Sequence, residues 1–332
     1  MNNRKRIRKE DLQKALIILS VIFFLIAAGG FLISRWENAK YATGGGEGTV
    51  EADTVMREAR TYTYQGQDYK ENKKVRSYLI IGCDTTGEAI SRTNGGQADA
   101  QVLIVVDDLN QTWRLLQLDR DTIVNFDTFN PEGKLIGDVD GQLTLAHSFG
   151  TWENGAKNTA NAVSRLLWDQ KIDGYFSMNM DAIPTLNDAV GGVPVKVTTD
   201  FTEVDDTLTL GEEITLTGEQ AERFVRTRKT VDDGTNEARM ARQETYMKSL
   251  IKKLSSLSSD EILDIYDRLM ANSVTNMGSG DFVDLADMTK EYTQLDNVRF
   301  EGTHQMNGNF MEFLIDEDSR TQVILELFYT KE

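Results

Sequence analysis

Three short runs of continuous apolar residues predict buried β-strands in the first half of the chain. The runs cover residues 77–83, 100–106 and 113–118, and their length suits strands buried on both faces better than helices. Residues 107–110 carry the Asp and Asn side chains that favour turns. We therefore expect the second and third strands to form an antiparallel hairpin.

The rest of the chain alternates between helical and strand patterns without one regular period. Helical spacing of apolar positions occurs in residues 143–149, 158–168, 182–190, 221–226, 239–254, 260–271 and 319–328. Strand patterns occur in residues 174–180, 193–197, 297–300 and 310–315. Asp181 is a candidate helix cap, and Thr217 with Gln220 resembles a capping box. This order predicts an α/β (α+β) fold, a mixed central sheet flanked by helices, in one domain over residues 75–332.

An apolar segment near the N-terminus predicts a membrane anchor. Residues 15–34 are uncharged, and at ~1.5 Å per residue they are long enough to cross a ~30 Å hydrocarbon core. Basic residues dominate before this segment, so residues 1–14 are expected in the cytoplasm and the bulk of the chain outside. Residues 35–74 are polar and partly Gly-rich, which predicts an extracellular stalk.

A cleaved signal peptide is the alternative for this segment. Ala27-Ala28-Gly29 resembles a small-residue cleavage site. The apolar run continues through Phe31-Leu32-Ile33, however, and it exceeds the roughly 7–15 residues usual for a signal peptide core. The pattern therefore favours an uncleaved, single-pass anchor. A large exported domain with a single cysteine, Cys83, cannot form an internal disulfide, which is typical of a bacterial cell surface.

The charge distribution excludes nucleic acid as a partner. The chain has a formal net charge of −17. Residues 1–36 contain seven basic and two acidic side chains, a net charge of +5, which leaves −22 for the remainder. A domain this acidic repels polyanions at long range. A phosphate group bound by it would need a local cluster of arginines or a divalent cation.

Charged side chains stand at the ends of the three predicted strands. Asp84 follows the first strand, Asp99 precedes the second, and Arg120-Asp121 follow the third. If the strands are neighbours, these groups gather at one edge of the sheet, where sheet proteins often place their sites. The carboxylates of Asp84 and Asp99 suit a hard divalent cation such as Mg²⁺. Turn and cap roles for Asp are at least as common, so the pair alone leaves both interpretations open.

Arginines are concentrated in a second stretch, between residues 216 and 243. The candidates there carry basic or amide side chains, and they are Arg226, Arg228, Arg239, Arg242 and Gln243. Guanidinium groups bind phosphate in a bidentate manner and keep their charge. If residues 226–228 are extended, the two arginines at the ends of that segment point the same way. The alternative is a solvated helix face whose arginines pair with the acidic residues 232, 233 and 237.

The other reactive residue types are interpreted as structural. His147 and His304 are the only histidines, and neither has the spacing of a metal ligand. Cys83 lies within an apolar strand, which indicates a packed thiol.

Seven short motifs follow one another between residues 78 and 254. They are Leu79-Ile-Ile-Gly-Cys-Asp84, Ala98-Asp-Ala-Gln-Val-Leu-Ile-Val-Val106, Leu118-Asp-Arg-Asp-Thr122, Asp188-Ala-Val-Gly-Gly-Val193, Leu216-Thr-Gly-Glu-Gln-Ala221, Val225-Arg-Thr-Arg228 and Arg239-Met-Ala-Arg-Gln243. Their order resembles that of the LytR-CpsA-Psr family of bacterial cell-envelope proteins. Each motif alone is a modest signal, whereas seven in order behind an N-terminal anchor are specific.

The resemblance implies a phosphotransferase that moves a glycopolymer from an undecaprenyl-pyrophosphate carrier to a peptidoglycan hydroxyl group, with Mg²⁺ or Mn²⁺. The implied roles are Asp84 and Asp99 as metal ligands, Arg120 and Asp121 as catalytic residues, and Arg226, Arg228, Arg239, Arg242 and Gln243 around the pyrophosphate. Asp121 would either orient Arg120 or assist the incoming hydroxyl. The apolar interior between sheet and helices would take the lipid tail, which places the domain close to the membrane lipid.

Three positions depart from the family pattern. Thr86 and Gln97 stand where the family commonly has arginine, and Asp119 stands where it has proline. These changes make the expected site less cationic, and Arg92 and Arg114 are candidates to compensate. They leave open a second function, that of a catalytically reduced accessory protein that binds polyprenyl phosphate. A third possibility is a hydrolase with water as the acceptor.

Overall fold

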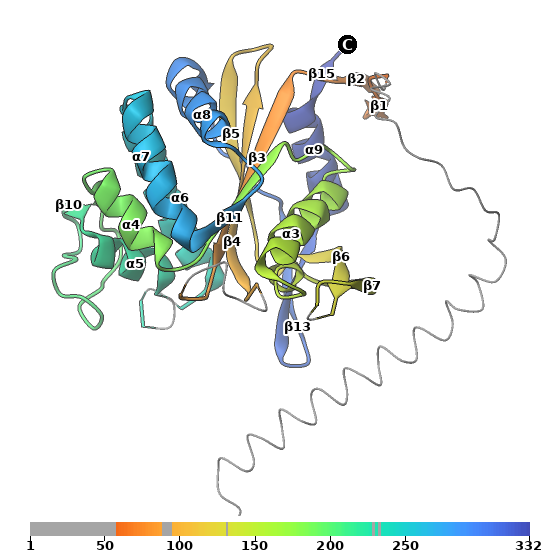
Figure 1. The fold of residues 1–332 in the computed structure, drawn as a ribbon. Coiled ribbons are helices and arrows are strands. Elements are labelled where there is room, and N and C mark those ends of the chain that lie inside the picture. Colours follow the sequence, from red (N-terminus) through yellow and green to blue (C-terminus); the bar gives the residue numbers. More distant parts are fainter. Residues whose placement is uncertain (1–57, 88–94, 131, 228–229, 232–233) are drawn as a thin grey trace, which may run out of the picture. The chain divides into compact units, whose positions relative to one another are not determined.

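The computed structural model describes residues 58–87, 95–130, 132–227, 230–231 and 234–332, and its centre is a six-stranded mixed sheet (Figure 1). The strands run in the spatial order β11 (Ser273–Thr275), β8 (Gly174–Met178), β3 (Val75–Cys83), β4 (Ala98–Asp107), β5 (Thr112–Leu118) and β12 (Thr293–Gln294). The strand β4 pairs antiparallel with both β3 and β5, whereas β8 lies parallel to β3. The three predicted strands and their hairpin are therefore confirmed.

Helices cover both faces of this sheet. On β3, Leu79 and Ile81 pack into one core with α3 (Trp152–Leu166) and α9 (Glu317–Phe328). Tyr78, which precedes Leu79, faces the opposite core, which includes residues of α6 (Asn236–Leu254) and α8 (Ser279–Glu291). Figure 1 shows α6, α7 and α8 on one side of the sheet and α3 and α9 on the other. The continuous apolar runs reflect burial on both faces, and the mixed α/β architecture is as predicted.

The remaining elements flank this three-layer core. They are α2 (Leu143–Ala146), α4 (Ala182–Ala189), α5 (Gly218–Arg226), α7 (Ser259–Leu269), the short helix η2 (Met270–Asn272), and the two-stranded sheets β6 (Ile123–Phe129) with β7 (Leu135–Gln142), β9 (Val193–Lys196) with β10 (Glu213–Leu216), and β13 (Gly302–Asn307) with β14 (Phe310–Ile315). The capping box predicted at the start of α5 is present, since Thr217 accepts from the backbone of Gln220.

Several predicted elements differ from the structure. Residues 297–300 form no strand, and only Val298 makes an isolated bridge to Leu116. Asp181 does not cap α4 through its side chain, because its carboxylate accepts a hydrogen bond from Gly87 N instead. The helix α6 begins at Asn236, earlier than predicted, because Thr235 supplies an N-cap oxygen to Ala238. The helix α8 was not predicted from the pattern.

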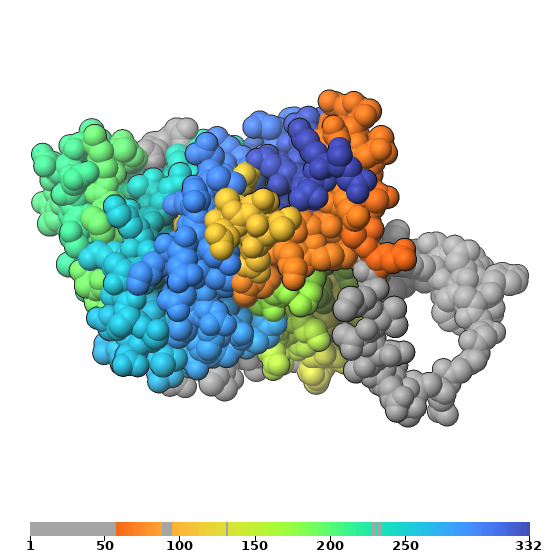
Figure 2. Space-filling model, turned by 90° about the horizontal axis from the view of Figure 1, so that it is seen from above, coloured from red at the N-terminus to blue at the C-terminus, as the bar shows by residue number. Residues whose placement is uncertain are grey.

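The folded unit also begins earlier than predicted. It spans Ala59–Glu332, because β1 (Thr61–Tyr64) and β2 (Gln67–Glu71) form a sheet with β15 (Tyr329–Lys331) at the other end of the chain. Figure 2 shows these early and late segments, in orange and dark blue, side by side. The predicted stalk over residues 35–74 was therefore wrong at its C-terminal end. The short, polar strands pair with a segment about 260 residues away, which local patterning does not reveal.

The predicted anchor, residues 15–34, lies outside the described residues. Among the described helices, none is long and apolar enough to cross a membrane.

A chain that begins at Val75 is expected to be less stable than one that begins at Ala59. The shorter chain loses β1, β2 and the buried ion pair in which Arg60 donates to Glu71 at 3.0 Å. We expect its thermal midpoint to fall by about 5 °C or more, because a few kcal/mol correspond to several degrees in a domain of this size. Calorimetry of the two chains at pH 7 measures this difference.

The variant Glu71→Gln serves as the control that isolates the ion pair. Burial alone would raise the pKa of Glu71, but hydrogen bonds from Arg60 and Lys73 outweigh it and hold this pKa at about 2. A lowered folded-state pKa stabilises the fold above the unfolded value near 4.5, and that contribution is lost as the pH falls toward 2. The difference in the free energy of unfolding between Glu71→Gln and the unmodified chain should therefore become smaller as the pH falls from about 4.5 to 2. Equal thermal midpoints for the chains that begin at Ala59 and at Val75 would show that β1 and β2 contribute nothing to the stability of the fold.

Candidate functional site

The sheet brings the predicted strand-end residues together at one edge. Cys83 at the end of β3 pairs with Ala98 at the start of β4, and Gln101 of β4 pairs with Leu118 at the end of β5. The residues that follow or flank these positions are Asp84, Asp99, Arg120 and Asp121. Their predicted gathering is confirmed for Arg120 with Asp99 and with Asp121, which are in direct contact.

Asp99 forms ion pairs with two arginines from different elements. Its Oδ1 accepts from Arg120, which follows β5, and its Oδ2 accepts from Arg239 Nη1 of α6 at 3.0 Å. The side chains are well buried, with 18% of Asp99 and 6% of Arg239 exposed. Charge-assisted bonds at such a site are strong because water does not compete for them. The carboxylate thus fixes both guanidinium groups at the edge of the sheet.

Asp84 joins this group through Gln97 rather than by direct contact. The backbone N–H of Gln97 donates to Asp84 Oδ1 at 3.0 Å, and Arg120 Nη2 donates to Gln97 Oε1 at 2.9 Å. Gln97 occupies a position where the sequence resemblance led us to expect arginine, and it acts here as an acceptor for Arg120. A neutral amide therefore replaces a positive charge at the rim of the site.

Asp121 is held in place from two sides. Its Oδ1 lies 3.6 Å from Arg120 Nε and accepts from Gln142 Nε2 at 2.9 Å. The residue is almost fully buried. These contacts favour the role of orienting Arg120, one of the two roles expected for Asp121, over direct contact with an incoming hydroxyl.

Asp119 belongs to a network that the sequence did not reveal. Its carboxylate accepts from Asp121 N at 2.8 Å, from Asn236 Nδ2 at 3.1 Å and from His304 Nε2 at 3.0 Å. Asn236 in turn accepts from Arg239 Nη2 at 2.8 Å. Asp119 thus ties the start of α6 and the β13–β14 hairpin to the strand end. The partners lie 117 and 185 residues away in sequence, so no local signal could have identified them.

The arginine-rich stretch divides into different roles. Arg226 ends α5, forms an ion pair with Glu222 at 2.9 Å, and is 54% exposed. Arg226 is therefore helical rather than part of an extended segment, and Thr227 after it has an extended backbone. Arg228 lies outside the described residues. Gln243 donates to Val225 O at 3.2 Å.

Arg242 supports the end of α5. It donates to the carbonyl oxygens of Phe224 and Thr227, and its guanidinium lies 5.6 Å from the centre of the Phe201 ring. The last carbonyl groups of a helix lack partners within the helix, so a buried arginine that binds them stabilises its end. These bonds indicate a structural role, whereas the prediction had Arg242 at the pyrophosphate. Arg239 pairs with Asp99. Residues 232 and 233, which belong to the alternative interpretation of the arginines as members of a solvated helix face, lie outside the described residues.

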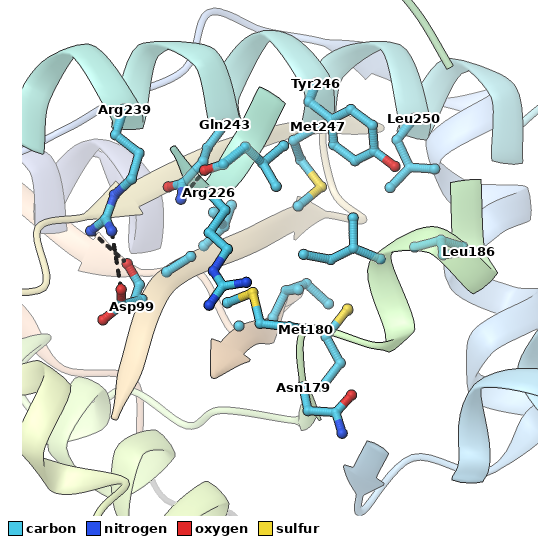
Figure 3. Close-up of a pocket in the computed structure, with 17 residues that line it drawn as sticks. Asp99, Asn179, Met180, Leu186, Arg226, Arg239, Gln243, Tyr246, Met247 and Leu250 are labelled. Carbon is cyan, nitrogen blue, oxygen red and sulfur yellow. Dashed lines mark hydrogen bonds and ion pairs between the residues drawn. The ribbon is translucent and has the colours of Figure 1, made fainter. Parts of the chain in front are cut away.

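A cavity opens next to the paired arginines. It encloses about 850 Å³ of empty space, including its open mouth, between the sheet and α6. Its walls are mostly apolar side chains such as Ile80, Val102, Leu186 and Leu250. Its polar end is formed by Asp99, Arg226, Arg239 and Gln243. Figure 3 shows Arg226 and Arg239 extending toward this end from different helices.

A second apolar cavity continues from the first. It spans about 690 Å³ of space, including solvent at its opening, and is lined by Ile104, Phe176 and Phe282 among others. The two cavities share Ile80, Met178, Leu186, Met247 and Leu250 as lining residues. Together they form an extended apolar space with a cationic group at one end, which suits an amphiphile with an anionic head.

The histidine and cysteine near the site are structural, as predicted. Cys83 is fully buried. His147 is also fully buried, and its ring bonds to Gly95 O and Ser177 Oγ at 2.9 Å each. Burial lowers the pKa of His147 to about 4. Arg114, a candidate to compensate for the missing arginines, instead pairs with Glu326 near the start of β5, and Arg92 lies outside the described residues.

Comparisons with known proteins agree with this architecture. The model of the LytR_cpsA_psr family matches residues 40–328. The polyisoprenyl-teichoic acid–peptidoglycan teichoic acid transferase TagU of Bacillus anthracis is 30% identical over 83% of this chain and 82% of that protein. The protein of the same name from Enterococcus faecalis is 28% identical over 77% of this chain and 80% of that protein. The crystal structure of B. subtilis TagV is similar with a TM-score of 0.61 and 26% identity, covering 77% of this chain and 96% of that one.

We expect Asp99→Asn to lower the free energy of unfolding by about 2–4 kcal/mol, because two buried arginines lose their charged partner. Asp84→Asn is the matched control, since this exposed carboxylate accepts one backbone bond among the described contacts, and its effect should be much smaller. Urea denaturation of both variants at pH 7 measures the difference. Similar losses in the two variants would mean that Asp99 does not hold the site together.

The buried, neutral ring of His147 should make the stability of the fold sensitive to acid. Its folded-state pKa of about 4 lies below the ordinary 6.5, so the unfolded chain binds the proton first and stability falls as the pH drops from 6.5 to 4. The loss from this group should reach at most ~3 kcal/mol. Unfolding measured across this range should show a shallower pH dependence for His147→Gln. An unchanged slope would contradict the neutral, buried state of the ring.

Proposed function

The chain belongs to the LytR_cpsA_psr family, and we propose that it transfers a glycopolymer from a polyprenyl-pyrophosphate carrier to peptidoglycan. One observation carries the proposal: Asp99 and Arg239 line the polar end of an extended apolar cavity, and Arg120 is paired with Asp99. This combination fits a lipid with a charged phosphate head. The compared relatives from Bacillus anthracis and Enterococcus faecalis are named as teichoic acid transferases, which supports transfer chemistry as the family activity.

The apolar cavities would receive the lipid tail. Their shared wall of Ile80, Met178, Leu186, Met247 and Leu250 offers surface without charge. Burial of a hydrocarbon chain against such a wall contributes roughly 25 cal/mol per Å² of apolar area. Methionine side chains are flexible, so two of the five residues can adapt to an irregular isoprenoid chain. The tail would thereby fix the position of the pyrophosphate at the cavity's polar end.

The arginines would bind the pyrophosphate. Arg239 and Arg120 now donate to Asp99, and phosphate oxygens would compete with that carboxylate for the same N–H groups. Arg226 is exposed and ends α5, a different helix from the one that carries Arg239, so it can move toward an anion. Fixed positive groups that face developing negative charge commonly contribute a factor of roughly 10²–10³ to a rate.

The carboxylate oxygens of Asp84 and Asp99 are suitable ligands for Mg²⁺ or Mn²⁺. Mg²⁺ usually takes one or two carboxylates and completes its shell with water and phosphate oxygens. Among the described residues no group of three acidic, histidine or cysteine side chains forms a cation site, so such a cation would depend on these two and on the substrate. Asp84 is exposed and accepts one backbone bond through Oδ1 among the described contacts. The bound cation would offset charge on the pyrophosphate.

The transfer itself needs positioning more than covalent help from the protein. A peptidoglycan hydroxyl oxygen would attack the phosphorus that carries the glycopolymer and release its proton to solvent. The new P–O bond would form as the pyrophosphate P–O–P bond breaks, and polyprenyl phosphate would leave. Arg120, oriented by Asp121, and Arg239, held by Asn236, would stabilise the charge on the leaving phosphate.

The proposed function calls for attachment to a bacterial membrane, with the folded unit outside the cell. The carrier lipid resides in a bilayer, and residues 15–34 form the predicted single-pass anchor. An accessory protein that binds polyprenyl phosphate without transfer is the second candidate. It is favoured by Gln97, whose neutral amide bonds Arg120 where a further arginine was expected.

One assay separates these functions. The full-length protein in detergent is incubated with a lipid-pyrophosphate-linked glycan, peptidoglycan oligomers and Mg²⁺, and products are followed by mass spectrometry. We expect transfer that falls by roughly 10²-fold or more in Arg120→Ala and in Arg239→Ala. Chelation of the metal should suppress it, and Mn²⁺ should restore it.

The control is Arg268→Ala, which removes an exposed arginine that pairs with Asp264 on α7, and transfer should be unaffected. Lipid binding without transfer by the unmodified protein would replace the transferase with the accessory function. Release of the glycan phosphate to water, with no product on peptidoglycan, would establish the hydrolase.

A further inference from the structure

The β13–β14 hairpin has an apolar tip that is exposed to solvent. At its tip, residues 306–311, Met306 is 60% exposed, Phe310 67% and Met311 39%. None of the six tip residues is charged, and Gly308 with φ +62° makes the turn. Figure 1 shows the hairpin extending beyond the end of the central sheet. A projecting group of large apolar side chains indicates an interaction surface.

The base of this hairpin is bonded to the candidate site. Phe313 N donates to Asp121 O at 2.8 Å, and His304 bonds the carboxylate of Asp119 at 3.0 Å. Gln142 Nε2 donates to both Met311 O and Asp121 Oδ1. The hairpin is therefore attached to the segment that carries Arg120. Through Gln142, this attachment reaches Met311 at the edge of the tip.

The chain outside the described residues allows this end to face a bilayer. Residues 15–34 predict a membrane segment, and 24 residues, 35–58, separate it from the folded unit. At ~3.3 Å per residue such a segment can reach up to about 80 Å, whereas a folded unit of this size is about 50 Å across. Chain length therefore does not prevent the hairpin tip from reaching the membrane surface.

We propose that the hairpin tip inserts into the interfacial layer of the membrane and holds the candidate site at the level of the lipid head groups. The proposal rests on the proposed function, since a carrier lipid presents its pyrophosphate at that level. Three side chains offer far less area than the roughly 800 Å² per partner of a stable dimer, which disfavours a second copy of the chain as the occupant. Phe and Met suit the interface, and a small apolar contact suffices because the anchor keeps the domain near the bilayer.

The contact should be apolar rather than electrostatic. The chain beyond residue 36 carries a charge of −22, and the one acidic residue of β14, Glu312, is bonded by Gln305 and Asn307. Anionic lipids therefore offer no attraction. Insertion should occur in zwitterionic vesicles and should not increase with anionic lipid.

A fluorescent label at the tip tests the proposal in the full-length protein. The single native cysteine, Cys83, is buried, so Asn309→Cys can be labelled selectively with a polarity-sensitive dye. The protein is then reconstituted in phosphatidylcholine vesicles. We expect a blue shift at the tip and quenching by brominated lipid, but neither for a label at Lys157→Cys on exposed α3 surface. Met306→Ser with Phe310→Ser should abolish both signals.

Absence of the shift at the tip would overturn the proposal. A shift that brominated lipid does not quench, and that grows with protein density, would also overturn it and would assign the surface to a second copy. Transfer assays separate this outcome from a failure of the proposed function. The Met306→Ser/Phe310→Ser variant should keep transfer from a detergent-dispersed carrier and lose roughly tenfold or more from a vesicle-embedded one. If the unmodified protein transfers from neither the detergent-dispersed nor the vesicle-embedded carrier, the proposed transferase function is refuted. The fluorescent label reports membrane insertion whether or not transfer occurs.

Discussion

The ion pairs of Asp99 are the interaction on which this architecture depends. One carboxylate, at the start of β4, holds Arg120 from the end of β5 and Arg239 from the first turns of α6. A buried guanidinium without a counter-charge is costly, so the three side chains fix one another. They also fix the distance between α6 and the sheet, and the apolar cavity lies in that space. The polar contact that stabilises the fold is thus the same one that positions the candidate site.

This arrangement gives Asp99 the character of an internal anion that a substrate phosphate can replace. The two arginines keep their charge at all physiological pH values, and their partner on the protein is a group of the same sign and similar geometry as a phosphate. The surrounding contacts limit their freedom. Asp121 orients Arg120 and Asn236 bonds Arg239, while Asp119 links both regions to His304 on the β13–β14 hairpin. Asp119 and Gln97, which lower the positive charge expected of the family pattern, are thus integrated as acceptors in the network.

Local patterns in the sequence were sufficient for four of the six strands of the central sheet, β3, β4, β5 and β8, for most helices and for the family, whereas the short edge strands β11 and β12 were not predicted. Continuous apolar runs identified β3, β4 and β5 because both faces of those strands are buried, and strand adjacency then brought Asp99 to Arg120. Side-chain roles that depend on distant partners could not be inferred. Arg242 looked like a phosphate ligand, yet its bonds go to backbone carbonyls at the end of α5. The first two strands were missed because they pair with the other end of the chain, and the link from Asp119 to His304 spans 185 residues.

The most direct test of this account is the affinity of Asp99→Asn for a polyprenyl pyrophosphate, measured without metal at a temperature where the variant remains folded. If Asp99 occupies the arginines in the absence of substrate, its neutralisation frees them, and binding should be at least as tight as in the unmodified protein. Arg239→Gln, which removes one of the two guanidinium groups, should bind clearly more weakly. A loss of affinity in Asp99→Asn as large as that in Arg239→Gln would contradict the account.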